Sequence, residues 1–188
     1  MTANTVRRIV PKRHVDERGW LTETYSDPAF AALGIDCRFL QDNHVLSVSA
    51  FTLRGLHFQA PPRSQAKLVR CVRGCIFDVA VDIRRGSPTY GQWVGSELSA
   101  ANGHQLFIPI GFAHGFVTLE SECEVIYKCS DTYAPDHDGG IRWDSVGIAW
   151  PLQTGQAPIL SAKDRTLPLF SNFDSPLYYQ GGPLTPLS

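Results

Sequence analysis

The sequence contains no apolar run close to the roughly 20 residues that a membrane-spanning helix requires. Residues 1–14 carry basic side chains without an apolar segment after them, so we expect no secretory signal peptide. An excess of one charge is also missing, because 17 Lys and Arg residues nearly balance 18 Asp and Glu residues. We therefore expect a cytoplasmic protein whose bulk charge favours neither nucleic acid nor a membrane surface as its partner.

The sequence also lacks the cysteine pattern of a disulfide-stabilised protein. Its five cysteines are odd in number and lie mostly inside apolar, strand-like segments. We interpret them as small buried hydrophobic residues in a reducing compartment, in preference to disulfide partners or zinc ligands. They are Cys37, Cys71, Cys75, Cys123 and Cys129.

Short β-rich segments recur from residue 44 onward, and each is closed by Gly, Pro or Asn. Little helical sequence separates them, which favours a mainly β, antiparallel sandwich or barrel with a few short helices. Hydrophobic residues make up 43% of the 188 residues, enough for one substantial core. Without a repeat or a linker, residues 1–188 are expected to form a single domain, with 166–188 as a surface tail.

The clearest helix signal covers residues 28–33. Asp27 is the expected N-cap, Pro28 suits the first turn, and Gly34 suits the position after the helix. A second short helix is expected near residues 161–165. The sequence thus predicts two short helices in an otherwise β-rich chain.

The segment at residues 75–83 alternates with the two-residue period of a strand. One face would carry Phe77, Val79, Val81 and Ile83, and the other would carry Asp78, Ala80 and Asp82. Either the sheet has one solvent-exposed face, or the barrel interior is partly polar because it holds a ligand.

Asp82 either binds a histidine of such a pocket or lies at the strand end. Arg84 and Arg85 close the strand, and we expect them in a solvated turn.

Residues 103–114 have the pattern G-x5-P-x-G-x2-H, which resembles the second motif of the cupin superfamily and would turn His114 into the barrel. The first cupin motif normally supplies two histidines and a glutamate to a metal ion. Here the matching positions carry His57, Gln59 and Lys67. Because an ammonium group repels a divalent cation, the pattern argues against a bound metal.

Three polar side chains suit proton abstraction beside a carbonyl group. A histidine such as His57 is a common base near neutral pH. Lys67 offers positive charge where an enolate oxygen develops, and Tyr133 offers an acid for the opposite face of the carbon. Taken alone, a histidine in a strand such as His57 is more often a structural residue, and a tyrosine such as Tyr133 is more often a loop aromatic.

Several motifs in order are more specific than any one of them. Over about residues 10–168 the chain resembles the dTDP-4-dehydrorhamnose 3,5-epimerase family, which acts on dTDP-4-dehydro-6-deoxyglucose on the way to dTDP-L-rhamnose. The motifs are D-E-R-G at 16–19, Q-D-N-H at 41–44, R-G-L-H-F-Q at 54–59, Q-A-K-L-V-R-C at 65–71, F-D-V-A-V-D-I-R at 77–84, G-F-A-H-G-F at 111–116 and L-S-A-K-D at 160–164.

The resemblance implies a cupin-type jelly-roll enzyme that uses no metal and no cofactor. His57 would be the base with Asp164 behind it, Lys67 would stabilise the enolate, and Tyr133 would be the acid. Trp143 would stack on thymine. Further contacts with the nucleotide sugar are implied for Gln41, Asn43, Arg54, His114 and Lys163.

The resemblance also implies a homodimer in which N-terminal strands reach the partner subunit, so that Arg18 and Glu23 complete its site. Two features depart from the family pattern: W-L-T at 20–22 replaces a phenylalanine run, and the loop after Trp143 is short. A single-position epimerase, acting at C3 or C5 only, is the first alternative, because such enzymes share most of these motifs. A metal-dependent cupin oxygenase or isomerase and a non-catalytic sugar-binding module are the others.

Overall fold

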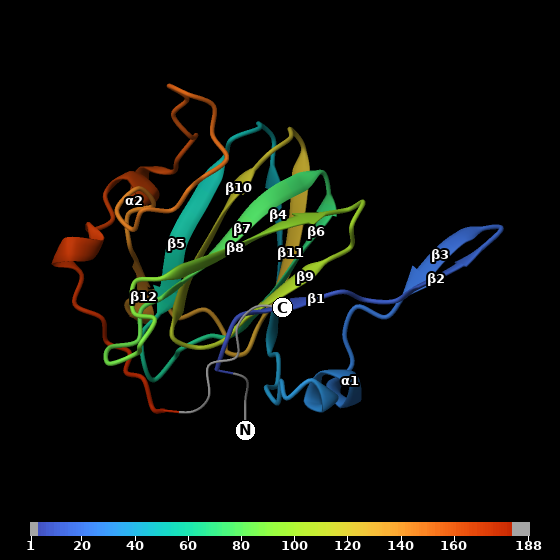
Figure 1. The fold of residues 1–188 in the computed structure, drawn as a ribbon, viewed down its shortest axis with the longest axis horizontal. Coiled ribbons are helices and arrows are strands. Elements are labelled where there is room, and N and C mark those ends of the chain that lie inside the picture. The colour runs from blue at the N-terminus through green and yellow to red at the C-terminus, as the bar shows by residue number, and fades with distance from the viewer. Residues whose placement is uncertain (1–3, 182–188) are drawn as a thin grey trace.

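The computed structural model describes residues 4–181, and its centre is a barrel of two antiparallel five-stranded sheets (Figure 1). The first sheet has the order β1 (Arg7–Ile9), β9 (Gln105–Ile108), β6 (Lys67–Arg73), β11 (Cys123–Cys129) and β4 (Gln41–Ser47). The second has the order β12 (Asp138–Gly140), β5 (Leu53–Gln59), β10 (Phe112–Thr118), β7 (Cys75–Asp82) and β8 (Trp93–Ser99). The predicted mainly β, antiparallel barrel is confirmed.

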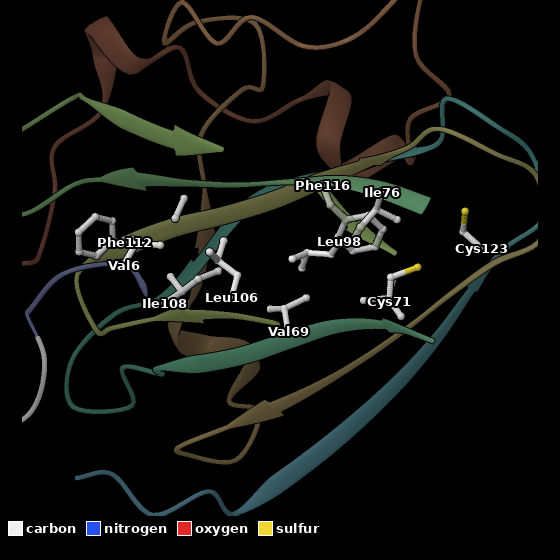
Figure 2. Packing of buried hydrophobic residues seen from close by; sticks show 12 residues of the cluster. Val6, Val69, Cys71, Ile76, Leu98, Leu106, Ile108, Phe112, Phe116 and Cys123 are labelled. Carbon is white, nitrogen blue, oxygen red and sulfur yellow. The ribbon is translucent and has the colours of Figure 1, made fainter. Parts of the chain in front are cut away.

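An apolar core lies between the two sheets, because alternate residues of each strand point inward. Val69 and Leu106 from the first sheet meet Ile76, Leu98 and Phe116 from the second (Figure 2). All five are 3% exposed or less. Burying each such side chain contributes about 1.5–3 kcal/mol relative to leaving it in water. This layer therefore fixes the spacing between the sheets.

Strand β7 has the predicted alternation, but neither of its faces is open to water. Val79 and Phe77 pack on the outside of the sheet against later segments of the chain, and the Phe77 and Trp150 ring centroids lie 6.3 Å apart. On the other face Asp78 is 0% exposed and binds His114 inside the barrel. The interior is therefore partly polar, and the face that could have been solvated is covered by residues 146–173.

Arg84 is buried, so the expectation of a solvated turn is wrong for this residue. Its guanidinium group binds the Asp82 carboxylate at 2.6 Å and lies over the rings of Phe112 and Tyr179. Burial alone would raise the pKa of Asp82, but hydrogen bonds from Arg84, Ser87 and Thr89 outweigh that effect and hold the pKa below its ordinary value. Asp82 therefore belongs to a structural ion pair at the strand end.

The two predicted helices are present as α1 (Asp27–Ala32) and α2 (Ala162–Arg165), with 3-10 turns η1 (Pro135–His137) and η2 (Phe170–Asn172). The expected N-cap was wrong by one residue: Ser26 takes that position, and the Asp27 carboxylate accepts from the Tyr25 hydroxyl instead. Gly34 follows the helix with φ +74°, as expected. Within residues 4–181 no helix is long and apolar enough to cross a membrane.

The hairpin of β2 (Arg13–Asp16) and β3 (Gly19–Thr22) projects away from the barrel (Figure 1). Its apolar side chains lie in solvent: Val15 is 77% exposed, Trp20 57% and Leu21 69%. Large apolar side chains gathered on a projecting element are typical of a surface that another molecule covers.

All five cysteines, which the described residues include, are free thiols, and four of them are buried, as predicted. Burial raises the pKa of Cys71 and of Cys75 to about 12. Cys37 is half-buried, and burial raises its pKa to about 11. Residues 166–181 of the predicted tail lie against the barrel through the buried Leu177, whereas 182–188 lie outside the described residues.

Candidate active site

A cavity of about 480 Å³ opens between the two sheets, beside helix α2. Its wall includes the side chains of His57, Lys67, His114 and Asp164, four of the residues expected from the sequence. A second cavity of about 400 Å³ shares His57 and Lys67 with the first and continues toward the barrel rim. Strands of both sheets and the short helix thus bring residues far apart in the sequence to one site.

His57 and His114 are cross-strand partners on β5 and β10, so both imidazoles lie on the same face of the sheet. The Nε2 atom of His57 lies 2.6 Å from Oδ1 of Asp164. This contact leaves Nδ1 as the ring nitrogen of His57 without a protein partner among the described residues. The two strands can approach closely here because Gly55 and Gly115 have no Cβ atom. A Cβ atom on either residue would clash with the backbone of the other strand.

Asp164 is 2% exposed and comes from helix α2. Burial alone would raise the pKa of its carboxyl group, but hydrogen bonds from His57, the Gly55 N–H and Ser161 together hold the pKa below its ordinary value. The carboxylate is therefore ionised at neutral pH and fixes the orientation of the His57 ring. The expected contact between His57 and Asp164 is present.

His114 has its own carboxylate, which sequence reasoning did not assign to it. Its Nε2 atom lies 3.0 Å from Oδ2 of Asp78, on neighbouring strand β7. Burial lowers the pKa of His114, and the charge of Asp78 offsets only part of that effect. A neutral His114 that donates from Nε2 to Asp78 keeps Nδ1 as a hydrogen-bond acceptor.

Lys67, the first residue of β6, faces the two histidines from the opposite sheet. Burial lowers the pKa of its ammonium group, and the negative charges of Asp78 and Asp138 act in the other direction. The Nζ atom lies 5.9 Å from the ring centroid of Tyr127. Positive charge held in a low-dielectric cavity is suited to stabilise a developing anion.

Tyr127 lines both cavities and was not predicted as a site residue. It lies half-buried on β11, and burial raises the pKa of its hydroxyl group. The two-residue period of that strand places Tyr127 on the same side as the buried residues Val125 and Cys129. That inward alternation was the signal available in the sequence.

Tyr133 lies at the rim and is 59% exposed. Its hydroxyl group donates to Asp138 at 3.0 Å, and Lys163 Nζ binds the same carboxylate. The hydrogen bond to Asp138 is the main reason that the pKa of Tyr133 is raised. Asp138 was missed in the sequence because it begins β12, a strand of only three residues in which no two-residue period can be recognised, yet it joins two expected site residues.

Gln59 stands where a metal-binding cupin has a second histidine, and its amide is used elsewhere. Nε2 donates to the carbonyl oxygen of Arg63 at 2.6 Å, and Oε1 accepts from the Ala134 N–H at 2.8 Å. Gln41 similarly accepts from the Tyr133 N–H at 2.8 Å. Two glutamines therefore hold the Tyr133 segment over the cavity. Over residues 4–181 no group of three or more His, Cys, Asp or Glu residues is arranged to hold a metal ion.

The other expected contacts divide into those at the cavity and those away from it. Arg54 lines the first cavity, and Asn43 lines the second together with Gln41 and Lys163. Trp143 lies outside the walls of both, and its carbonyl oxygen accepts from the indole N–H of Trp150.

Arg18 and Glu23 also lie away from the cavities. Arg18 pairs with Asp16 on the projecting hairpin. Glu23 is exposed and accepts from the Ser26 hydroxyl. Within one chain, these two residues do not reach the site.

Comparison with known proteins identifies the family to which this site belongs. The family model described as dTDP-4-dehydrorhamnose 3,5-epimerase matches residues 2–172. The chain belongs to the dTDP-4-dehydrorhamnose 3,5-epimerase family. The family's enzyme from Salmonella typhimurium is 52% identical over 164 residues, which cover 86% of this chain and 88% of the relative. The enzyme from Methanothermobacter thermautotrophicus is 51% identical over 159 residues, covering 84% and 85%.

Solved structures of dTDP-4-dehydrorhamnose 3,5-epimerases share the fold. A dTDP-6-deoxy-D-glucose-3,5-epimerase from Legionella pneumophila, in complex with dTDP-4-keto-L-rhamnose, is 44% identical, with a TM-score of 0.87 and 93% of each chain covered. The enzyme from Bacillus anthracis, with TDP and pyrophosphate bound, is 46% identical, with a TM-score of 0.84 and coverage of 87% and 93%. A 3′-monoepimerase from Streptomyces bikiniensis, solved with dTDP as a histidine and tyrosine double mutant, is 32% identical, with a TM-score of 0.80 and coverage of 88% and 82%. The expected cupin-type fold is thus confirmed.

Proposed function

We propose that this chain epimerises dTDP-4-dehydro-6-deoxy-D-glucose at C3 and C5 to dTDP-4-dehydro-L-rhamnose, as a step of dTDP-L-rhamnose biosynthesis. One observation carries the proposal: His57, held by Asp164 at 2.6 Å, shares a cavity with the Lys67 ammonium group. The family's L. pneumophila structure binds dTDP-4-keto-L-rhamnose, which supports a nucleotide-linked keto sugar as the substrate.

Each epimerisation needs one proton removed and one returned on the opposite face. Nδ1 of His57 takes the proton from the carbon beside the C4 ketone, and the electrons of that C–H bond move onto the ketone oxygen. Lys67 stabilises the resulting enolate oxygen, and His114 lines the sugar pocket beside it. Protonation from the other face restores the ketone with the carbon inverted. No oxidation or reduction occurs.

A tyrosine is the expected acid, and two lie near His57. Tyr133, the residue expected from the sequence, lies at the exposed rim. Tyr127 is deeper and lines the first cavity with His57 and Lys67. In the S. bikiniensis double mutant, the replaced histidine and tyrosine are 70 positions apart, which is the separation of His57 and Tyr127. We therefore favour Tyr127 as the acid and keep Tyr133 as the alternative.

The nucleotide diphosphate is assigned to the cationic and amide side chains around the cavity mouth. Arg54 and Lys163 supply positive charge, and Gln41 and Asn43 supply hydrogen-bonding groups. Trp143 lines neither cavity, so its expected contact with thymine has no support from the cavity walls and stays a prediction.

We further propose a homodimer in which each projecting hairpin completes the partner subunit's site with Arg18 and Glu23. The exposed Trp20 and Leu21 side chains support an interface at this hairpin. The enzyme is proposed to work in the cytoplasm, where its five free thiols stay reduced.

Proton NMR of the protein with dTDP-4-keto-6-deoxyglucose in heavy water tests the proposal. Deuterium entering both C3 and C5 is expected. Incorporation at one carbon only would assign the chain to the single-position epimerases. No exchange at either carbon would leave a sugar-binding module or a metal-dependent cupin, and metal analysis of the purified protein separates those two.

A further inference from the structure

We propose that Ser161 is a positioning residue that holds Asp164, and through it the base His57, in the reactive arrangement; this inference rests on the proposed function. Ser161 belongs to the L-S-A-K-D motif, but the mechanism above gives it no task. Its hydroxyl oxygen accepts a hydrogen bond from the Asp164 backbone N–H at 3.0 Å.

Helix α2 has little stability of its own. It contains four residues, and its closing bond, from the Arg165 N–H to the Ser161 carbonyl, is 3.3 Å long. Such a short helix is not stable without contacts from the rest of the protein, because fixing the backbone of the first turn costs more free energy than its single hydrogen bond contributes. Ser161 provides that support twice, as the N-cap hydroxyl and as the first carbonyl acceptor.

The chain just before Ser161 is anchored to the strand that carries His57. Ile159 accepts from the Leu53 N–H at 2.9 Å and donates to the Phe51 carbonyl at 2.9 Å. Leu53 begins β5, which also contains His57. Ser161 therefore links a fixed point on the histidine strand to the helical turn that presents the carboxylate.

Ser161 carries no packing role that would explain its position. It is exposed and lies on the wall of the first cavity, so truncation to alanine leaves no void in the core. Its hydroxyl is also one of the groups that hold the pKa of Asp164 down. The contribution of Ser161 is thus to the orientation of Asp164 and not to the barrel's stability.

The test compares Ser161→Ala, Ser161→Thr and a control, Thr166→Ala, at the other end of the same helix. Thr166 is exposed and donates to the Lys163 carbonyl at 3.0 Å. Loss of an N-cap is expected to lower kcat/KM by on the order of tenfold in Ser161→Ala, with threonine restoring most of it. Thr166→Ala should stay near the wild-type value. In an Asp164→Asn background, Ser161→Ala should cause no further loss.

A second measurement does not depend on turnover. Proton NMR of the free protein should resolve the hydrogen-bonded ring N–H of His57, assigned by its absence in His57→Asn. Ser161→Ala should shift or broaden this signal, while the His114 signal from the Asp78 pair stays unchanged as an internal reference. An unperturbed His57 signal, or an equal kcat/KM loss with and without Asp164, would overturn the role of Ser161. If the wild-type protein exchanges neither C3 nor C5, the proposed function fails, and the NMR comparison alone decides the role of Ser161.

Discussion

His57 and His114 occupy directly paired positions on β5 and β10, and each imidazole binds a different carboxylate, Asp164 at 2.6 Å and Asp78 at 3.0 Å. Their exposure separates them: 31% of the His57 side chain is accessible, against 6% for His114. A base must exchange protons with substrate and solvent, whereas a polar wall residue need not. The two pairs therefore differ in task although they are alike in chemistry.

Replacing the base should stop proton exchange at both carbons. His57→Asn is expected to lower deuterium incorporation at C3 and C5 by about 10²–10⁴-fold, the usual range for losing a general base. Affinity for dTDP, measured by calorimetry, should stay close to wild type, because the nucleotide contacts lie elsewhere. Retained exchange at either carbon would show that another group removes that proton.

The two tyrosines can be separated by matched variants. Tyr127→Phe should abolish net inversion while still allowing washout of the substrate proton, because His57 continues to form the enolate. Tyr133→Phe should mainly raise KM, since Tyr133 contacts Asp138 at the rim. Product stereochemistry and deuterium washout, measured in the same NMR samples, report both effects. The reverse pattern would return the acid role to Tyr133.

Lys67 should set an alkaline limit on activity. Burial lowers the pKa of its ammonium group, so the charge that stabilises the enolate is lost as pH rises through a value below the ordinary lysine pKa of about 10.4. The kcat/KM profile should fall on that limb, and Lys67→Arg should move the fall to higher pH at reduced activity. An alkaline limb that is the same in both proteins would assign the titration to another group.

The regular parts of the fold were predictable because they depend on local sequence. The alternation in β7 follows from a two-residue period that any strand imposes. The segments that cover its outer face were not predictable, since Trp150 lies outside the strands and helices and Phe170 lies in the three-residue turn η2, and neither segment has a periodic signal. The N-cap error at Asp27 has a similar cause: Ser26 and Asp27 are both suitable residues, and only the backbone decides between them.

In the site, the motifs predicted most of the groups around the cavity, but they missed Tyr127 on β11 and Asp138 on β12. His57, Lys67 and His114 do meet in one cavity. Asp138 joins the site from the three-residue strand β12, and Arg84 is buried because an ion pair and two aromatic rings surround it. Neither placement has a sequence signature.

The buried Arg84–Asp82 pair should matter for stability at neutral pH. Arg84→Met leaves the Asp82 carboxylate buried without its cation and should lower the free energy of unfolding by about 3–5 kcal/mol, measured with urea. Asp82 has a pKa below its ordinary value in the folded state, so its contribution is present above about pH 4 and is lost as pH falls. The difference between wild type and variant should therefore shrink at pH 3. A constant difference would contradict this account.

Subunit complementation tests the hairpin. Arg18→Ala and His57→Asn should each be nearly inactive, because each removes one part of every site. Mixed in equal amounts and allowed to exchange subunits, they should recover about a quarter of wild-type activity, since half of the dimers carry one intact site. Absence of recovery, with a dimer verified by sedimentation, would mean that Arg18 does not serve the partner's site.

The buried free thiols make the barrel's own opening measurable. With their pKa values raised by burial, Cys71 and Cys75 hold almost no thiolate at pH 8, so a thiol reagent reaches them only when the surrounding strands separate. Half-buried Cys37, near α1, should be labelled first. Cys129 lines the second cavity, so its labelling should slow when nucleotide sugar is bound. The order in which the five thiols react would therefore rank the parts of the molecule by how often they come apart.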